Sequence, residues 1–229
     1  MTFSIVALDV ATGLIGAAIS TARLAVGARC LVVSSDLALA TQGLISVALA
    51  RKVHARASHM DLTSAVASAV ADDSGSSRRQ LVAVARTGDS ATFDGADLPH
   101  AHGSASGENW ACGGNTLASP DVIDAMATRY SSFGPGPLPN RLIDALLAGD
   151  TAGGDRRGRQ SAALRVMSSN TAWPGIDLRV DDHPDPVREL GRLFELWRQE
   201  WEVFDATGRF PPARPASTRE LNSGFGELP

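Results

Sequence analysis

Two long apolar runs at the start of the chain restrict its fold more than any other sequence feature. Residues 3–8 and 14–19 are almost continuously apolar and do not alternate with polar residues. Strands of this kind are buried on both faces, so the sheet that they form must be covered on both sides. Asp9 and Gly13 lie between the runs and give the connection a turn composition. The pattern therefore predicts a β-hairpin in a sheet enclosed between other layers.

The rest of the chain places strands and helices in separate groups. The expected elements are a second hairpin at 30–33 and 37–40, helices at 44–58 and 61–72, strands at 80–86 and 90–94, a surface loop at 95–109, a short strand at 109–114, a helix from Pro120 with Ser119 as its N-cap, a helix at 138–148 that stops at Gly149, strands at 160–167 and 176–181, and a last helix from Asp185. Doubly buried strands grouped apart from helices predict an α+β fold, a four-layer αββα sandwich.

Composition and charge exclude several classes of protein. The 229 residues are 44% hydrophobic, which suits one globular domain, and the formal net charge of −4 argues against a nucleic-acid-binding surface. Arg23 and Arg29 interrupt the apolar segment 14–33, so a membrane span is not expected. The N-terminus lacks the basic region of a signal peptide, and we expect a cytoplasmic protein. Residues 1–204 form the predicted domain, and residues 205–229, rich in Pro, Gly and Arg, form a C-terminal arm without a predicted fold.

Thr2 is the strongest candidate for a catalytic residue. Removal of Met1, which occurs when the second residue is small, would leave a threonine with its hydroxyl and a free α-amine on adjacent atoms. An α-amine has a pKa of about 7.7–8.0 and can act as the general base for its own hydroxyl. The alternative is that Met-Thr is simply a common start with no catalytic meaning.

Several motifs resemble an uncharacterised bacterial family, domain of unknown function 1028. They are TFSIVALD at 2–9, Thr12-Gly13, the run from Ile19-Ser20 through Ala25-Val26-Gly27, Ala40-Thr41-Gln42, GNTLA at 114–118, AGGDRRGRQSAA at 152–163 and LRVDDHP at 178–184. The resemblance covers about residues 2–200. It implies the fold of the N-terminal nucleophile (Ntn) hydrolases and, through Thr2, a hydrolase, but no substrate. The chain departs from the family at Gly43-Leu44-Ile45-Ser46, where an Asn-Pro pair is frequent, and at Thr116, where Met is frequent.

The motifs also suggest residues around Thr2. Asn115 follows two glycines and could donate to the oxyanion of a tetrahedral intermediate, or it could be a turn residue in the left-handed conformation. Arg156 or Arg157 could bind a substrate carboxylate with Asp155 orienting it, or the segment could be a tight turn with a structural ion pair. Gln42 is a further candidate for substrate binding. Gln160 and Ser161 enter the following strand, and one of them could face the site. Ser20 could line the site with its hydroxyl or be a satisfied strand end.

We therefore predict an amidohydrolase that cleaves a small, anionic amide through a Thr2 acyl-enzyme, without cofactor or metal. The expected partner is a small-molecule substrate, with no nucleic acid and no membrane, and the expected assembly is a homo-oligomer such as a dimer.

Two groups of residues are poor metal sites: Asp181-Asp182-His183, because neighbouring strand residues point apart, and the pair His100 and His102, because no Cys or acid cluster supports the histidines. Two alternatives stay open: a hydrolase that uses Cys112 and a histidine, and a non-catalytic module that binds a metabolite or cell-wall fragment. Cys30 and Cys112 are otherwise expected to be buried, reduced thiols.

Overall fold

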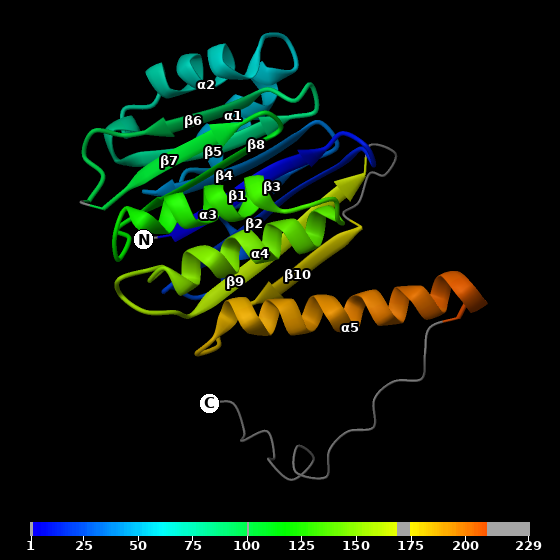
Figure 1. Ribbon diagram of the computed structural model, residues 1–229. Coiled ribbons are helices and arrows are strands. Elements are labelled where there is room, and N and C mark those ends of the chain that lie inside the picture. Colours follow the sequence, from blue (N-terminus) through cyan, green and yellow to red (C-terminus); the bar gives the residue numbers. More distant parts are fainter. Residues whose placement is uncertain (1, 100, 169–174, 210–229) are drawn as a thin grey trace, which may run out of the picture. The chain divides into compact units, whose positions relative to one another are not determined.

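The computed structural model describes residues 2–99, 101–168 and 175–209. The chain divides into two units, of which the first ends at Arg192. This first unit has four layers: a pair of helices, a larger sheet, a smaller sheet and a second pair of helices (Figure 1). The predicted α+β fold, an αββα sandwich, is confirmed.

The larger sheet is antiparallel throughout. Within the described residues its strands follow the order β10 (Ile176–Val180), β9 (Ser161–Ser168), β2 (Leu14–Thr21), β1 (Thr2–Asp9), β8 (Trp110–Asn115) and β7 (Gly103–Gly107). β1 and β2 form the predicted hairpin at the centre of this sheet, and almost all of their residues are buried. The register sets Thr2 directly opposite Asn115 on β8.

The smaller sheet contains β3 (Leu31–Val33), β4 (Leu37–Gly43), β5 (Arg79–Ala85) and β6 (Ser90–Asp94). Its outer face packs against α1 (Val47–Ala57) and α2 (Leu62–Ala71), which follow the short connection after β4. The larger sheet is covered by α3 (Asp121–Ser132) and α4 (Leu138–Thr151). Two short 3₁₀ turns, Val26–Ala28 and Ser76–Arg78, complete the connections. No helix in the described part of the chain is both long and apolar enough to cross a membrane.

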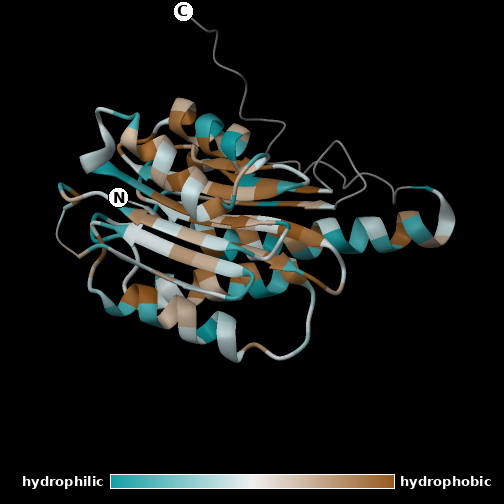
Figure 2. Ribbon diagram, turned by 90° about the horizontal axis from the view of Figure 1, so that it is seen from above, coloured by the Kyte–Doolittle hydropathy of each residue, from teal (hydrophilic) through white to brown (hydrophobic). Residues whose placement is uncertain are grey.

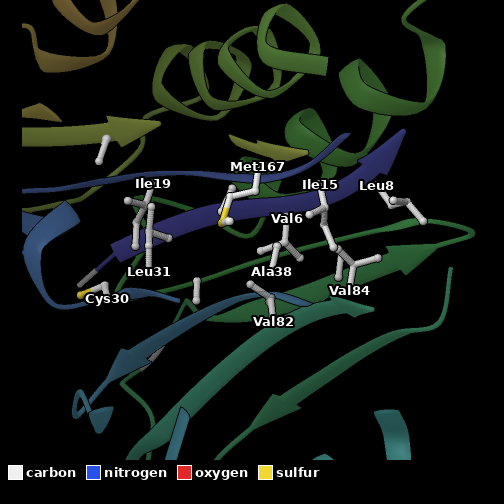
Figure 3. Close-up of a cluster of buried hydrophobic side chains, with 14 of the residues drawn as sticks. Val6, Leu8, Ile15, Ile19, Cys30, Leu31, Ala38, Val82, Val84 and Met167 are labelled. Carbon is white, nitrogen blue, oxygen red and sulfur yellow. The ribbon is translucent and has the colours of Figure 1, made fainter. Parts of the chain in front are cut away.

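An apolar core fills most of the space between the two sheets. Val6 and Leu8 of β1 point toward Val82 and Val84 of β5, as Figure 3 shows. Each fully buried aliphatic side chain of this kind contributes roughly 1.5–3 kcal/mol to folding. Figure 2 shows the apolar colour concentrated on the strands, whereas the helices carry both colours. Toward Thr2 the same inter-sheet space becomes polar, with Ser4 and the side chains described below.

Three sequence predictions about element boundaries are wrong. The segment 95–109 is not all loop, because Gly103–Gly107 forms edge strand β7 and pairs with β8. α4 continues past Gly149 to Thr151; Gly149 serves close packing, since a Cβ there would lie 2.6 Å from Met126 Cγ. Ser119 does not cap α3, since its hydroxyl donates to the Asp121 carboxylate at 3.1 Å and Pro120 occupies the N-cap position.

The second unit begins at Leu193, within α5 (Pro186–Thr207). Its aromatic side chains contact each other in turn along one face of the helix: the ring centroids of Phe194 and Trp197 are 6.1 Å apart, and those of Trp201 and Phe204 are 5.3 Å apart. This is the predicted amphipathic face. The helix runs beyond residue 204, and residues 210–229 of the predicted arm lie outside the described residues.

Candidate active site

Thr2 lies at the beginning of β1 with its side chain on the face toward the smaller sheet. The residue is 7% exposed, and its Oγ1 donates to Thr21 Oγ1 on β2 at 3.4 Å. It borders a cavity of about 470 Å³, which we call the Thr2 cavity. The other lining residues are Thr21, Arg23, Leu24, Ala25, Val26, Arg29, Cys30, Gly43, Ile45, Arg157 and Gln160. The hydroxyl of Thr2 therefore adjoins a space large enough for a small molecule.

The charge of the Thr2 cavity is positive. Arg23, Arg29 and Arg157 line it, and no acidic side chain of the described residues does. Lys52, the sole lysine of the sequence, lies instead on α1, where its ammonium group donates to the Asp72 carbonyl. A scheme in which a lysine assists the nucleophile therefore has no support in the lining.

Asp155 holds one of these arginines in place. Its buried carboxylate accepts hydrogen bonds from the Arg157 backbone N–H at 2.8 Å and from Arg157 Nη2 at 3.1 Å, and it also accepts the Ala22 N–H at 2.8 Å. Gly153 and Gly154 make the tight turn before it, both with positive φ. The tight turn with a structural ion pair is therefore present, and it presents Arg157 to the cavity. Binding of a substrate carboxylate by Arg157 stays a prediction. Arg156 does not line the cavity.

The remaining candidates on β2 and β9 have different positions. Gln160 lines the cavity, and its amide donates to Asp182 Oδ1 at 3.2 Å. Ser161 is buried, donates to the Arg23 carbonyl at 2.5 Å and accepts the Val26 N–H at 3.0 Å. Ser20 lies on the opposite face of β2 from Thr21, and its hydroxyl donates to the Ser161 carbonyl at 3.1 Å. Ser20 and Ser161 therefore hydrogen-bond to the backbone and do not line the cavity. Ser20 is a satisfied strand end, and of Gln160 and Ser161 only Gln160 faces the cavity.

A buried amide network lies beside Thr2, between the two sheets. Asn115 Nδ2 donates to Gln80 Oε1 at 2.9 Å, and Gln42 Nε2 donates to Gln80 Oε1 at 3.2 Å and to the Gly113 carbonyl at 3.0 Å. Ser4 donates to Gln42 Oε1 at 3.2 Å. Gln42 is thus part of the interior and is not among the cavity-lining residues, and its role in substrate binding stays a prediction.

Asn115 itself is a strand residue. It is 1% exposed and pairs with Thr2 across the sheet, so the two side chains lie on the same face. The interpretation of Asn115 as a left-handed turn residue is wrong, because that conformation belongs to the next residue, Thr116, with φ of 49°. Asn115 is not among the cavity-lining residues, and its role as an oxyanion donor stays a prediction.

Sequence reasoning missed four residues of this region: Thr21, Arg23, Arg29 and Gln80. Both arginines were visible as interruptions of the apolar segment 14–33 and were used to argue against a membrane span. Their position in the segment directly after a doubly buried strand was the available signal. Gln80 lacked any local signal, since its partners come from distant strands.

The cysteine alternative has little structural support. Cys112 pairs with Ile5 and Ala105, on the face of β8 opposite to Asn115 and outside the Thr2 cavity. Burial raises the pKa of the Cys112 thiol to about 12 and that of the Cys30 thiol, which borders the cavity, to about 11. Both thiols are therefore protonated at neutral pH, and a protonated thiol is a poor nucleophile.

The motif Asp181-Asp182-His183 does not converge. The Asp181 carboxylate pairs with Arg179 at 2.7 Å, Asp182 accepts from Gln160, and His183 Nδ1 accepts the Asp185 N–H at 3.0 Å. His100 lies outside the described residues. Within the residues that the structure describes, no three His, Cys, Asp or Glu side chains form a group suited to a metal ion.

A second cavity, of about 770 Å³, lies at the other end of the smaller sheet, near Leu37 and Ala85. Its lining includes His54, whose Nε2 is 2.9 Å from Ser34 Oγ. The Ser34 hydroxyl also accepts the backbone N–H groups of the two residues that close its turn, Asp36 and Leu37. This arrangement is typical of a serine that stabilises a turn. The larger cavity therefore does not compete with Thr2 as a hydrolytic site.

The fold and this site define the class: an αββα sandwich with a threonine at the start of a central strand, beside a cationic cavity. The chain belongs to the family of unknown function DUF1028, whose model matches residues 2–190. The crystal structure of protein SPO2555 from Silicibacter pomeroyi, assigned to the same family, is similar, with 32% identity, a TM-score of 0.79 and coverage of 85% of each chain.

Two solved structures of Anbu, the ancestral beta-subunit, are more distantly similar. The protein from Yersinia bercovieri has 10% identity and a TM-score of 0.43, covering 93% of this chain and 100% of that one. The protein from Hyphomicrobium sp. strain MC1 has 13% identity and a TM-score of 0.45, covering 88% and 97%. No curated protein matches the sequence.

Proposed function

We propose that the protein is an Ntn amidohydrolase in which Thr2, freed by removal of Met1, cleaves a small amide. The observation that carries the proposal is the position of the Thr2 hydroxyl at the edge of a cavity of about 470 Å³. Among the described residues that line this cavity, the thiol of Cys30 is protonated and no lysine or histidine is present. The α-amine of a processed Thr2 is then the base closest to its own hydroxyl.

The chemistry has two steps. The α-amine accepts the proton of Thr2 Oγ1 as this oxygen attacks the amide carbonyl carbon, and the proton passes to the leaving nitrogen when the C–N bond breaks. An ester between Thr2 and the acyl group remains. The amine then accepts a proton from water, which attacks the ester, releases the carboxylic acid and restores the threonine. Thr21, whose hydroxyl lies 3.4 Å from Thr2 Oγ1, fixes the orientation of the nucleophile.

Asn115 is the proposed donor to the oxyanion. Its amide carries two N–H groups, of which one is donated to Gln80 Oε1. The Gln80 contact holds the Asn115 side chain opposite Thr2 across the strand pair. Loss of one oxyanion donor costs roughly 2.7–4 kcal/mol of transition-state stabilisation in a serine protease, and a similar loss is expected here.

A non-catalytic module that binds a small anion is the second candidate. It is favoured by one observation, the three arginines that line the cavity. Such a module would need neither the Thr2 hydroxyl nor a free α-amine. The two candidates therefore differ in their dependence on Thr2.

The test is hydrolysis of a library of small amides by the protein produced without an N-terminal tag. We expect Thr2→Ala to lose at least about a thousandfold in kcat, because the attacking oxygen is removed, and Thr2→Ser to keep measurable activity. Thr12→Ala, in the exposed turn at the other end of the same hairpin, is the matched control and should be unaffected. Full activity of Thr2→Ala would exclude the proposed mechanism.

A further inference from the structure

Two arginines of the Thr2 cavity lack partners among the described residues. The Arg23 and Arg29 side chains are exposed, and within the part of the chain that the structure describes neither forms an ion pair or a side-chain hydrogen bond. Arg157, the third arginine, is paired with Asp155. Arginines that border a cavity and are not engaged in an ion pair are suited to bind an anionic ligand.

The backbone that carries Arg23 and Arg29 is fixed by contacts to other elements. The Ala22 N–H donates to Asp155 at 2.8 Å, the Ala25 N–H donates to the Asp181 carbonyl at 3.0 Å, and the Arg23 carbonyl accepts from Ser161. Ala25 has φ of 53°, a conformation that is costly for a residue with a side chain and persists where its surroundings enforce it. The backbone positions of the two arginines are therefore set before any ligand binds, which lowers the part of the entropic cost of binding that comes from ordering this segment.

The segment that carries Arg23 and Arg29 also packs closely against β9, and this packing further fixes its backbone. A Cβ on Gly27 would lie 2.4 Å from the Ala163 side chain, so the 3₁₀ turn between the two arginines rests directly on the sheet. Arg23 and Arg29 thus lie before and after the 3₁₀ turn Val26–Ala28, which packs against the sheet beside the cavity.

A charge count gives the class of ligand. Three guanidinium groups line the cavity. Arg157 is paired with Asp155, whereas Arg23 and Arg29 form no ion pair within the described residues and bring two positive charges to the cavity. Cys30 does not change this balance, since burial raises the pKa of its thiol to about 11. Leu24, Val26 and Ile45 supply the apolar part of the lining, which suits a short hydrocarbon chain between charged groups.

We propose that Arg23 and Arg29 bind the two carboxylates of a dianionic substrate, and that the substrate class is the N-acylated amino dicarboxylic acids. The identity of the scissile amide rests on the proposed function, whereas the dianion site does not. Hydrolysis at Thr2 would release the free amino dicarboxylic acid and leave the acyl group on the threonine until water removes it. Each bidentate pair between an arginine and a carboxylate adds orientation as well as affinity.

The test compares two ligands of nearly equal size on Thr2→Ala protein by titration calorimetry. N-acetyl-L-glutamate has two carboxylates, and N-acetyl-L-glutamine has one. We expect the dianion to bind at least about tenfold more tightly, and Arg23→Gln and Arg29→Gln each to reduce its affinity about tenfold. Arg51→Gln, on an exposed position of α1 outside both described cavities, is the control. The preference should weaken with added salt.

Equal affinity for the two ligands, including no measurable binding of either, would overturn the dianion site. Retention of the preference in the double variant of Arg23 and Arg29 would also overturn it. Failure of the proposed function is distinguishable, because selective binding by a protein that hydrolyses no amide would leave the dianion site standing. Hydrolysis of amides without a preference for a dianionic ligand would support the proposed function and overturn the dianion site.

Discussion

At the scale of single residues, the buried carboxylate of Asp155 connects the sequence motif to the cavity. It accepts hydrogen bonds from the backbone of Ala22 and from both the backbone and side chain of Arg157. One residue therefore fixes the segment that carries Arg23 and the orientation of a second arginine. The glycines before it, Gly153 and Gly154, allow the turn that brings the carboxylate inward.

Replacement of Asp155 by Asn should therefore disturb stability and ligand affinity together. The variant keeps the size of the side chain but loses the charge that the Arg157 guanidinium faces. We expect the free energy of unfolding to fall by about 1.5–3 kcal/mol in urea titrations, the range for hydrogen bonds to charged groups. Asp36→Asn, at an exposed turn, is the control and should change it by less than about 0.5 kcal/mol. Equal stability of the two variants would show that Asp155 does not anchor the turn.

The buried thiols give the protein a predictable response to alkaline pH. Burial raises the pKa of Cys112 to about 12 from an ordinary value of 9.0, so the folded state binds this proton more tightly than the unfolded state. The resulting stability is present below pH 9 and is lost as the pH rises from about 9 to about 12. We expect the free energy of unfolding of Cys112→Ala to fall less steeply over this range than that of the wild type, as measured by urea titration. If the free energy of unfolding fell equally steeply with pH in both proteins, the raised pKa of Cys112 would be contradicted.

The candidate site shows how far residue patterns can be read from sequence. Thr2, Arg157 and Gln160, which a terminal position and a motif single out in the sequence, line the cavity, and their roles there stay predictions. Whether Ser20 and Gln42 line the cavity could not be read from the sequence, because strand patterns do not show which face of a strand meets a cavity when both faces are buried; neither residue lines it. Gln80 and Thr21 were missed, since their importance arises from partners on other strands.

At the scale of elements, close packing of small residues brings α4 onto the central hairpin. Gly16 on β2 has no room for a side chain, because a Cβ there would lie 2.8 Å from the Arg165 carbonyl oxygen and 3.2 Å from Leu142 Cδ1 of α4. This explains why a doubly buried strand carries glycine and alanine. The sequence predicted the hairpin and both sheets, but it could not predict β7, whose Gly-Ser-Ala-Ser-Gly residues have low strand propensity.

Gly16→Ala should therefore destabilise the protein. The added methyl group displaces either β9 or α4, and overpacking of this kind costs about 1–3 kcal/mol. Gly134→Ala is a matched control, because a Cβ at Gly134 would meet nothing within 4 Å. Urea titration of both variants measures the difference. A Gly16→Ala variant as stable as the Gly134→Ala variant would contradict the packing shown between α4 and β2.

At the scale of the whole molecule, two buried sheets place the first residues of the chain in a protected position. β1 lies at the centre of the larger sheet, so its N-terminal end cannot fray as the end of an edge strand does. The buried amide network next to it rigidifies the same end of the sandwich. Such a frame is suited to a terminal nucleophile, since the position of the reacting oxygen must be held closely.

The assembly of the protein stays a prediction. We expect a homo-oligomer, of which a dimer is the simplest form, and sedimentation equilibrium of the full chain would measure it. A mass that stays at that of one chain of 23.9 kDa over the accessible concentration range would contradict this expectation.

The central claim is that Thr2 becomes the N-terminal residue and acts through its own amine. Intact mass and N-terminal peptide mass spectrometry of the active, untagged protein test it most directly. The account predicts a chain that lacks Met1 and begins with an unmodified Thr2. Active protein that retains Met1 would contradict it, because the α-amine that serves as the base would then be part of a peptide bond.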